Sequence, residues 1–155
     1  MRSGTLNSPG IVGFADALRL CQAEMLDESR RLGQLRSRLF DGLCEEARGV
    51  ALNGPELQRA DLRLAGNLNV SFRHVDGEAL MLSMKQLAVS SGSACTSANP
   101  EPSHVLRALG LGEDATRSSL RFGLGRFNTQ EDVDFAISTV AQSVGLLRKM
   151  SSITI

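Results

Sequence analysis

The stretch Asn-Leu-Asn-Val-Ser-Phe-Arg at residues 67–73 decides the fold class, because its side chains alternate between polar and apolar. Alternation with a period of two is typical of a β-strand with one face in a core and one polar face. A second stretch, Leu-Arg-Phe-Gly-Leu at residues 120–124, repeats the alternation. Two half-buried strands of this kind predict a sheet that helices cover on one face.

Shorter segments complete the predicted sheet. Residues 50–52 (VAL) indicate a short strand that ends in the turn Asn-Gly-Pro at 53–55, and residues 87–89 (LAV) indicate another. Residues 55–66 are polar and predict a loop. The sheet therefore has three or four strands.

Three shorter helices follow from capping residues. Asp76 is the expected N-cap of a helix that runs to about Lys85. Ser103 begins a short helix that Gly110 stops, and Thr129 caps the last helix. The predicted apolar face of the last helix consists of Val133, Phe135, Ala136, Ile137, Val140, Val144 and Leu147.

The N-terminal third of the chain predicts one long helix. Ser8 and Pro9 are the expected N-cap and first helical residue, and the helical period continues to about residue 47, with a break possible at Gly33. Two interpretations stay open, a helical hairpin or coiled-coil arm, and a spine helix that joins this domain to something larger. The seven-residue repeat consists of Ile11, Leu18, Met25, Leu32 and Leu39.

Together these elements predict an α+β fold, with a three- or four-stranded sheet, helices on one face and a long N-terminal spine helix. The 155 residues are expected to form a single domain, with the long helix over about 9–47 and an α/β core over about 48–150. The share of hydrophobic residues, 42%, is ordinary for a globular protein and excludes extensive disorder.

Charge and hydropathy exclude two classes of partner. Lys plus Arg and Asp plus Glu both number 17, so the formal net charge is zero, which argues against nucleic-acid binding by bulk electrostatics. No apolar run approaches the roughly 20 residues that span a bilayer. The N-terminus lacks the apolar core of a signal peptide. We therefore expect a cytoplasmic protein that binds neither nucleic acid nor membrane.

The cysteines are Cys21, Cys44 and Cys95, an odd number without a CxxC motif, which argues against a disulfide framework and a paired-cysteine zinc site. Cys21 and Cys44 fall in the helical pattern, where a thiol is expected to behave as a small hydrophobe. Cys95 lies in SSGSACTSANP (90–100), whose small side chains predict an accessible loop. From the residues alone, a reactive thiol and an incidental one both remain open.

Two arginines and one hydroxyl are candidate anion ligands. Arg121 and Arg126 lie in or just after a predicted strand, where they either point to solvent in ion pairs or form a fork that binds a carboxylate. The opening Arg-Ser-Gly-Thr at 2–5 places the hydroxyl of Thr5 beside a glycine, an arrangement that can donate to a phosphate.

Two longer stretches resemble a known family. SSGSACTSANPEPSHVLRALG (90–110) and SSLRFGLGRFNTQEDVD (118–134) closely resemble the C-terminal domain of cysteine desulfurases, pyridoxal-phosphate-dependent members of the class-V aminotransferase family. Within that family the chain is most similar to the type that serves general iron–sulfur cluster assembly. The segments RSGT (2–5), NLNVSF (67–72) and DGEALM (76–81) match in the same order.

The resemblance implies a set of roles. Such enzymes are homodimers of fold-type I that convert L-cysteine to L-alanine and hold the sulfur as a persulfide. The nucleophile that accepts the sulfur matches Cys95, the arginine that binds the substrate carboxylate matches Arg121, and the ligand of the cofactor phosphate in the opposite subunit matches Thr5. The persulfide then passes to an iron–sulfur scaffold or another acceptor protein, where Cys95 briefly contacts a nascent iron–sulfur cluster.

One family feature is missing. The only lysines are Lys85 and Lys149, and neither stands in the Ser-x-His-Lys setting of the cofactor lysine. We therefore expect a C-terminal fragment without the lysine domain, which alone binds no pyridoxal phosphate covalently and turns over no cysteine. The chain is then half of a split enzyme completed by a separate large-domain chain, a non-catalytic persulfide carrier, or a remnant without an independent role.

Overall fold

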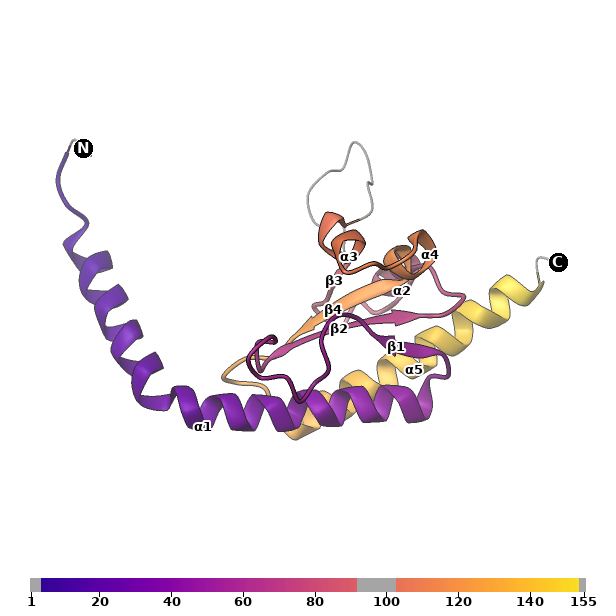
Figure 1. The fold of residues 1–155 in the computed structure, drawn as a ribbon, viewed down its shortest axis with the longest axis horizontal. Coiled ribbons are helices and arrows are strands. Elements are labelled where there is room, and N and C mark those ends of the chain that lie inside the picture. The colour runs from indigo at the N-terminus through magenta and orange to yellow at the C-terminus, as the bar shows by residue number, and fades with distance from the viewer. Residues whose placement is uncertain (1–3, 92–102, 154–155) are drawn as a thin grey trace.

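A computed structural model describes residues 4–91 and 103–153 as a four-stranded antiparallel sheet that packs on two long helices (Figure 1). This arrangement confirms the predicted α+β fold with its long N-terminal helix. In chain order the elements are α1 (Ser8–Glu46), β1 (Val50–Leu52), β2 (Asn67–Phe72), α2 (Gly77–Ser83), β3 (Ser90–Ser91), α3 (His104–Ala108), α4 (Glu113–Arg117), β4 (Ser119–Gly123) and α5 (Gln130–Ile153).

The sheet has the strand order β1-β2-β4-β3, with every neighbouring pair antiparallel. The register pairs Val70 with Leu120 and Asn69 with Arg121 across β2 and β4. Because side chains alternate along a strand, this register gives the sheet one apolar and one polar face. The buried residues of the apolar face include Leu68, Val70, Phe72, Leu120 and Phe122.

The C-terminal part of α1 and most of α5 lie on the apolar face, and the last turns of α5 extend beyond the sheet (Figure 1). Gly42 of α1 allows a close crossing, since a Cβ built there would lie 2.4 Å from Cδ1 of Ile137 in α5. Leu80 of α2 and the following Met84 are also fully buried in this core. The helix residues that contribute to the core include Leu39, Leu43, Val133, Ile137, Val140 and Val144.

Three predicted N-caps are confirmed. Asp76 Oδ1 accepts a hydrogen bond from the amide three residues on at 2.8 Å, and Ser103 Oγ does the same at 3.5 Å. Thr129 and Asp132 exchange hydrogen bonds between side chain and amide at 3.3 and 3.0 Å, which forms a capping box. These local sequence signals therefore fix the starts of α2, α3 and α5.

The long helix differs from its prediction in its cap and in its continuity. Asn7, not Ser8, is the N-cap, because its Oδ1 accepts from the amide of Gly10 at 3.1 Å. The helix continues through Gly33 without a break. It is also a single helix rather than a hairpin, and it bends along its length (Figure 1).

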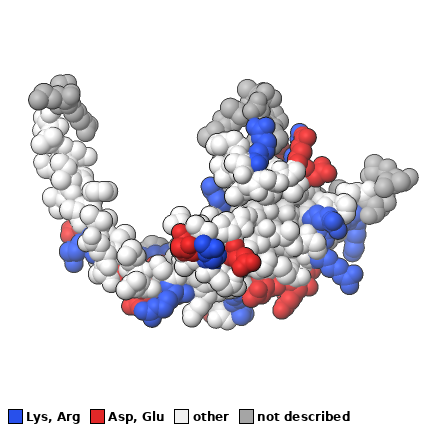
Figure 2. All heavy atoms as spheres, in the orientation of Figure 1, with Lys and Arg blue, Asp and Glu red and all other residues white. Residues whose placement is uncertain are grey.

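The first part of the chain, residues 4–27, projects from the fold, and we call it the arm. Every residue of the arm is exposed, and the first buried residue of α1 is Arg36. On the face that Figure 2 shows, most of the arm carries no charge, and its exposed apolar side chains include Ile11, Phe14, Leu18 and Met25. Among the described residues no helix is both long enough and apolar enough to span a membrane.

Two arginines hold the segment between β1 and β2. Arg36 donates to the carbonyls of Leu57 at 2.6 Å and Leu64 at 3.2 Å, and Arg63 donates to the carbonyl of Asn53 at 2.7 Å. Burial lowers the pKa of both guanidinium groups, and the charge of Arg36 lowers the pKa of Arg63 further. Both arginines line a groove of about 1210 Å³ beside α1.

The prediction of a strand at residues 87–89 is wrong. The ladder with β4 forms instead at Ser90 and Ser91, opposite Arg121 and Leu120. Leu87 and Val89 are partly buried against the core, so they are apolar because of packing and not because of strand pairing.

Two features of the helices also differ from the prediction. Helix α4 was not predicted, because its five residues are too few to show a helical period. Phe135 of the predicted apolar face of α5 is half exposed, at 51%, while Val133 beside it is buried.

Candidate functional site

Arg121 lies in the middle of β4 on the polar face of the sheet. Its neighbours Leu120 and Phe122 are buried on the apolar face, so the alternation of the strand directs Arg121 to the other side, where it is exposed. The register places Asn69 of β2 and Ser90 of β3 on either side of it. The guanidinium group is therefore flanked by two polar side chains on adjacent strands.

The one described hydrogen bond of the Arg121 side chain is weak. Its Nη2 donates to Ser90 Oγ at 3.4 Å, and within residues 4–91 and 103–153 no carboxylate forms an ion pair with it. A guanidinium group has five donors in a planar fork that matches a carboxylate. Within the part of the chain that the structure describes, most of the donors of Arg121 thus have no partner and can bind an anion.

The polar face beside Arg121 is held by a chain of hydrogen bonds. Asn53 Nδ2 donates to Asn69 Oδ1 at 2.7 Å and to Ser119 Oγ at 2.8 Å, and Ser119 Oγ donates to the carbonyl of Ala115 at 2.6 Å. These partners fix the neighbouring strands β1, β2 and β4 relative to one another. Sequence reasoning missed this network, although the alternation of residues 67–73 placed Asn69 on the polar face.

Cys95, the predicted nucleophile, lies outside the described residues. The described chain before it ends at Ser91, which pairs with Leu120 next to Arg121. In the sequence, three residues separate Cys95 from Ser91.

Thr5, the predicted phosphate ligand, is exposed near the free end of the arm. The arm projects away from the sheet (Figure 1), so the described part of the chain does not bring Thr5 of the arm to Arg121 of β4. The preceding Gly4 has a φ of 105°, a value that favours glycine. A site that used both residues would need a second chain or a further segment.

Arg126 does not form the carboxylate-binding fork that was one of its two interpretations from the sequence. It donates to Glu24 of α1 in an ion pair, as the alternative interpretation from the sequence held. Nearby, Arg31 of α1 donates two hydrogen bonds to Glu28, at 3.0 and 3.1 Å. These hydrogen bonds, followed by the charges of Arg31 and Arg126, lower the pKa of the Glu28 carboxyl.

The other two cysteines, Cys21 and Cys44, lie in α1 as the helical pattern predicted, but both are exposed, so neither packs as a small hydrophobe in the core. They lie in the helical part of the sequence but not on the side of α1 that faces the sheet. The pKa of the Cys44 thiol is raised, first by partial burial and then by the charges of Asp41 and Glu45. Cys44 is therefore a poor nucleophile near neutral pH.

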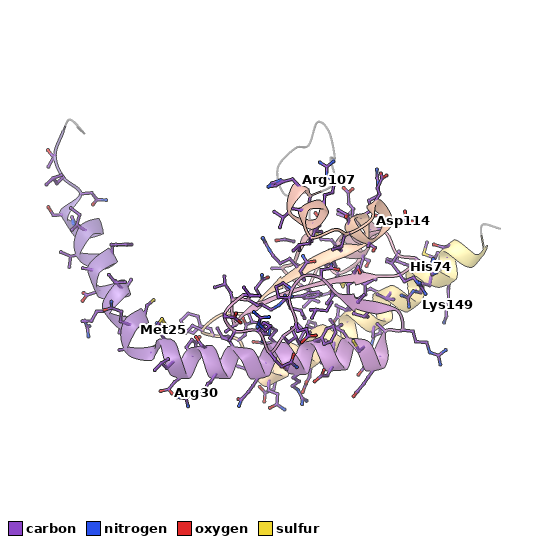
Figure 3. The ribbon with its side chains drawn as sticks, in the orientation of Figure 1. Met25, Arg30, His74, Arg107, Asp114 and Lys149 are labelled. Carbon is purple, nitrogen blue, oxygen red and sulfur yellow. The ribbon has the colours of Figure 1, made fainter. Side chains whose placement is uncertain are left out.

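The described residues do not fit a covalent site for pyridoxal phosphate. Such a site needs a lysine inside a cavity, but Lys85 and Lys149 are both exposed, and Figure 3 shows Lys149 at the surface of α5. Nor do three or more His, Cys, Asp or Glu side chains in the described part of the chain gather into a possible metal site.

Comparisons with known proteins agree with this arrangement. The sequence model of the family "Aminotransferase class-V" matches residues 1–135. A "Cysteine desulfurase IscS" from Tolumonas auensis is 52% identical over 151 residues, and one from Anaeromyxobacter dehalogenans is 54% identical over 150 residues. In both cases the match covers 97% of this chain but 36% of the relative. The chain thus spans about a third of the length of these curated relatives.

Solved structures show the same relation. A "NifS-like protein" matches 94% of this chain and 36% of its own, with a TM-score of 0.76 and 30% identity. A second NifS-like protein, from Rickettsia africae, matches 92% of this chain and 36% of its own, with a TM-score of 0.74 and 26% identity.

Proposed function

The chain belongs to the class-V aminotransferase family, and we propose that it is the sulfur-accepting, substrate-binding part of a cysteine desulfurase. One observation carries the proposal: Arg121 is exposed on a central strand, beside the short strand β3, which directly precedes the segment containing Cys95 in the sequence. The proposed carboxylate ligand therefore lies on the strand that pairs with the last described residues before the proposed nucleophile in the sequence. The named relatives, which are cysteine desulfurases, support the same chemistry.

Arg121 is the proposed ligand of the substrate carboxylate. Among the described residues its side chain forms one weak hydrogen bond, to Ser90, and no ion pair that a bound amino acid would have to replace. A bidentate pair with a carboxylate fixes both the position and the orientation of the amino acid. The rigid network around Asn69 and Ser119 keeps the strand in place during binding.

Cys95 is the proposed acceptor of sulfur. Its thiolate attacks the sulfur atom of L-cysteine, so that a sulfur–sulfur bond forms and the carbon–sulfur bond breaks. The electron pair of the broken bond stays on the carbon, which takes up a proton and becomes the methyl group of L-alanine. The reaction is balanced, because the thiols of Cys95 and L-cysteine give one persulfide on Cys95 and the methyl group of L-alanine.

Pyridoxal phosphate is the proposed cofactor of the complete enzyme, where it would supply the electron sink for cleavage of the carbon–sulfur bond. Because both lysines of this chain are exposed, the proposed covalent site lies outside the described residues. Thr5 would donate its hydroxyl to the phosphate from the exposed end of the arm. A homodimer, or a separate large-domain chain, would bring that phosphate to it.

The proposed acceptor of the persulfide is an iron–sulfur scaffold or another sulfur carrier, in the cytoplasm. Cys95 lies in a segment of small residues, which leaves room for a partner protein to reach the sulfur. A brief contact between Cys95 and a nascent cluster would follow the same route. A second candidate function, a persulfide carrier without its own turnover, is favoured by the surface position of both lysines.

The test is a desulfurase assay that follows alanine and sulfide after pyridoxal phosphate and L-cysteine are added. It is run with this chain alone, and with this chain mixed with the remaining N-terminal part of the Tolumonas auensis relative. Activity in the mixture that is lost with Cys95→Ser and Arg121→Ala would establish the proposed roles. Arg59→Ala is the control, because Arg59 forms an exposed ion pair with Asp61 away from the sheet.

A second arm separates the two candidate functions. The intact relative is supplied with ³⁵S-labelled cysteine in the presence of this chain. Label on Cys95 without activity in the mixture would favour the carrier. If Cys95 acquires no label and the mixture shows no activity, both functions are contradicted.

A further inference from the structure

Helix α1 changes direction near Met25, which Figure 3 labels beside the bend. In this region α1 contacts the turn at residues 125–128, which follows β4. The turn is closed by two hydrogen bonds, from the amide of Asn128 to the carbonyl of Gly125 at 3.1 Å and from the amide of Gly125 to Asn128 Oδ1 at 2.8 Å. A rigid turn thus lies against the helix where the arm begins.

Arg31 binds this turn with most of its donors. It donates to the carbonyls of Asn128 at 2.7 Å, Arg126 at 2.9 Å and Gly125 at 3.1 Å. Its remaining hydrogen bonds go to Glu28, one turn earlier on the same helix. The carboxylate holds the guanidinium group in place while three carbonyl groups of the turn converge on it.

Arg126 makes a second connection in the opposite direction. Its side chain extends from the turn to Glu24, which is the contact nearest to the free end of α1. The turn therefore binds α1 at two levels, through its carbonyl groups at Arg31 and through its own side chain at Glu24. Two connections one to two helical turns apart restrict the angle of a helix, whereas one connection would leave it free to pivot.

We infer that Arg31 and Arg126 are positioning residues that set the direction of the arm relative to the strand carrying Arg121. The inference rests on the proposed function for the roles of Thr5 and Arg121. Arg121 lies four residues before Gly125, and the amide of Leu124 donates to the carbonyl of Gly66 at 2.8 Å, so the turn moves with the sheet. The turn thus links the orientation of the proposed phosphate ligand to that of the proposed carboxylate ligand.

The arm depends on these polar contacts because it has no apolar core of its own. All its residues are exposed, and burial along α1 begins only at Arg36. Apolar packing therefore holds α1 after Arg31 but not before Glu24. The direction of residues 4–23 is left to the clamp, a name we use for the contacts of Glu24 and Arg31 with the turn.

The test is a distance measurement across the bend by pulsed electron paramagnetic resonance. One nitroxide label is attached at Cys44, which is exposed, and the other after Ser8→Cys, in a background of Cys21→Ser and Cys95→Ser. An unbent helix would separate the two positions by about 54 Å at 1.5 Å per residue. Labelled protein is diluted with unlabelled protein, so that only distances within one chain contribute.

We expect one narrow distance distribution below that value in the parent. Arg31→Ala combined with Arg126→Ala should broaden the distribution and move its maximum, and the milder Arg126→Gln should do so in part. Arg30→Ala is the matched control, because Arg30 pairs with Asp27 on the same helix and should leave the distribution unchanged. The charge-swapped double variant Glu24→Arg with Arg126→Glu should restore the narrow distance distribution that Arg126→Glu alone loses.

Two results would overturn the inference: an unchanged distribution in the double variant, or a broad distribution in the parent. A role in stability alone would lower the thermal midpoint without moving the distance measured in folded protein. The measurement needs neither cofactor nor substrate, so a failure of the proposed desulfurase function would leave its result interpretable.

Discussion

Arg121 of β4 and Ser90 of β3 are paired across the strands, and Arg121 Nη2 donates to Ser90 Oγ at 3.4 Å. The pairing joins the proposed carboxylate ligand to the strand that leads into the segment of Cys95. If Ser90 orients the guanidinium group, removing its hydroxyl should weaken substrate binding less than removing the Arg121 side chain, because the hydrogen bond between them is long.

The first prediction concerns Arg121 in the reconstituted desulfurase assay. Arg121→Ala should raise the KM for L-cysteine by about 10- to 100-fold, since a hydrogen bond to a charged group contributes about 1.5–3 kcal/mol. Arg121→Lys should restore part of the loss, because lysine keeps the charge but not the fork. Thermal unfolding should be nearly unchanged, as the side chain is exposed. An unaltered KM in Arg121→Ala would exclude the assigned role.

The second prediction concerns the core. Phe72 is fully buried on the apolar face of β2, so Phe72→Ala should lower the free energy of unfolding by about 3–5 kcal/mol. Phe127→Ala is the same substitution at a side chain that is 89% exposed, and it should cost far less. Urea unfolding of the two variants measures the difference. Equal losses would show that the described core does not carry the stability.

The third prediction concerns acid. Arg38 of α1 donates to Asp134 of α5 at 2.7 and 2.9 Å, and these hydrogen bonds lower the pKa of the Asp134 carboxyl. A carboxyl group whose pKa is lowered in the folded state stabilises the fold at pH values above its ordinary pKa. This stabilisation is lost as the pH falls through the pKa of the folded state. Asp134→Asn should therefore destabilise the protein near neutral pH, by an amount that shrinks from about pH 5 to about pH 3.

The control for that experiment is Glu131→Gln, since Glu131 is exposed in the same helix and the described structure gives it no ion pair. Urea unfolding across the pH range is the measurement. A stability difference between Asp134→Asn and the parent that stays constant with pH would contradict the assigned pairing.

The fourth prediction concerns self-association. The arm exposes Ile11, Leu18 and Met25 at seven-residue spacing, and an exposed apolar stripe of this kind favours association with another surface. Sedimentation velocity should show a weight-average mass that rises with concentration. Changing the three residues to glutamine should reduce this rise, while Leu62→Gln and Leu64→Gln, which are exposed elsewhere, should not. A monomer at every concentration would contradict the prediction.

Local signals in the sequence predicted most of the fold. Alternation at residues 67–73 identified β2, and the capping residues Asp76, Ser103 and Thr129 identified three helix starts. Such signals succeed because the physical cause lies within a few residues of chain. The strand at 87–89 failed for the opposite reason, since pairing depends on which residues of β4 lie opposite.

The candidate site was predictable only in part. The alternation of β4 indicated that Arg121 leaves the core, but the network of Asn53, Asn69 and Ser119 joins three strands that are distant in sequence. The exposure of Cys21 and Cys44 was also missed, because a helical period of apolar residues does not say which side of a long helix meets the sheet. Tertiary packing decides both.

One continuous helix therefore contains two parts that should differ in amide hydrogen exchange. In α5, and in α1 beyond Arg36, the amides can exchange only when the core opens. Residues 8–23 of α1 form the same backbone hydrogen bonds, yet no buried side chain resists their fraying. Deuterium uptake should therefore be fast before the clamp and slow after it, with the boundary inside an uninterrupted helix rather than at its end.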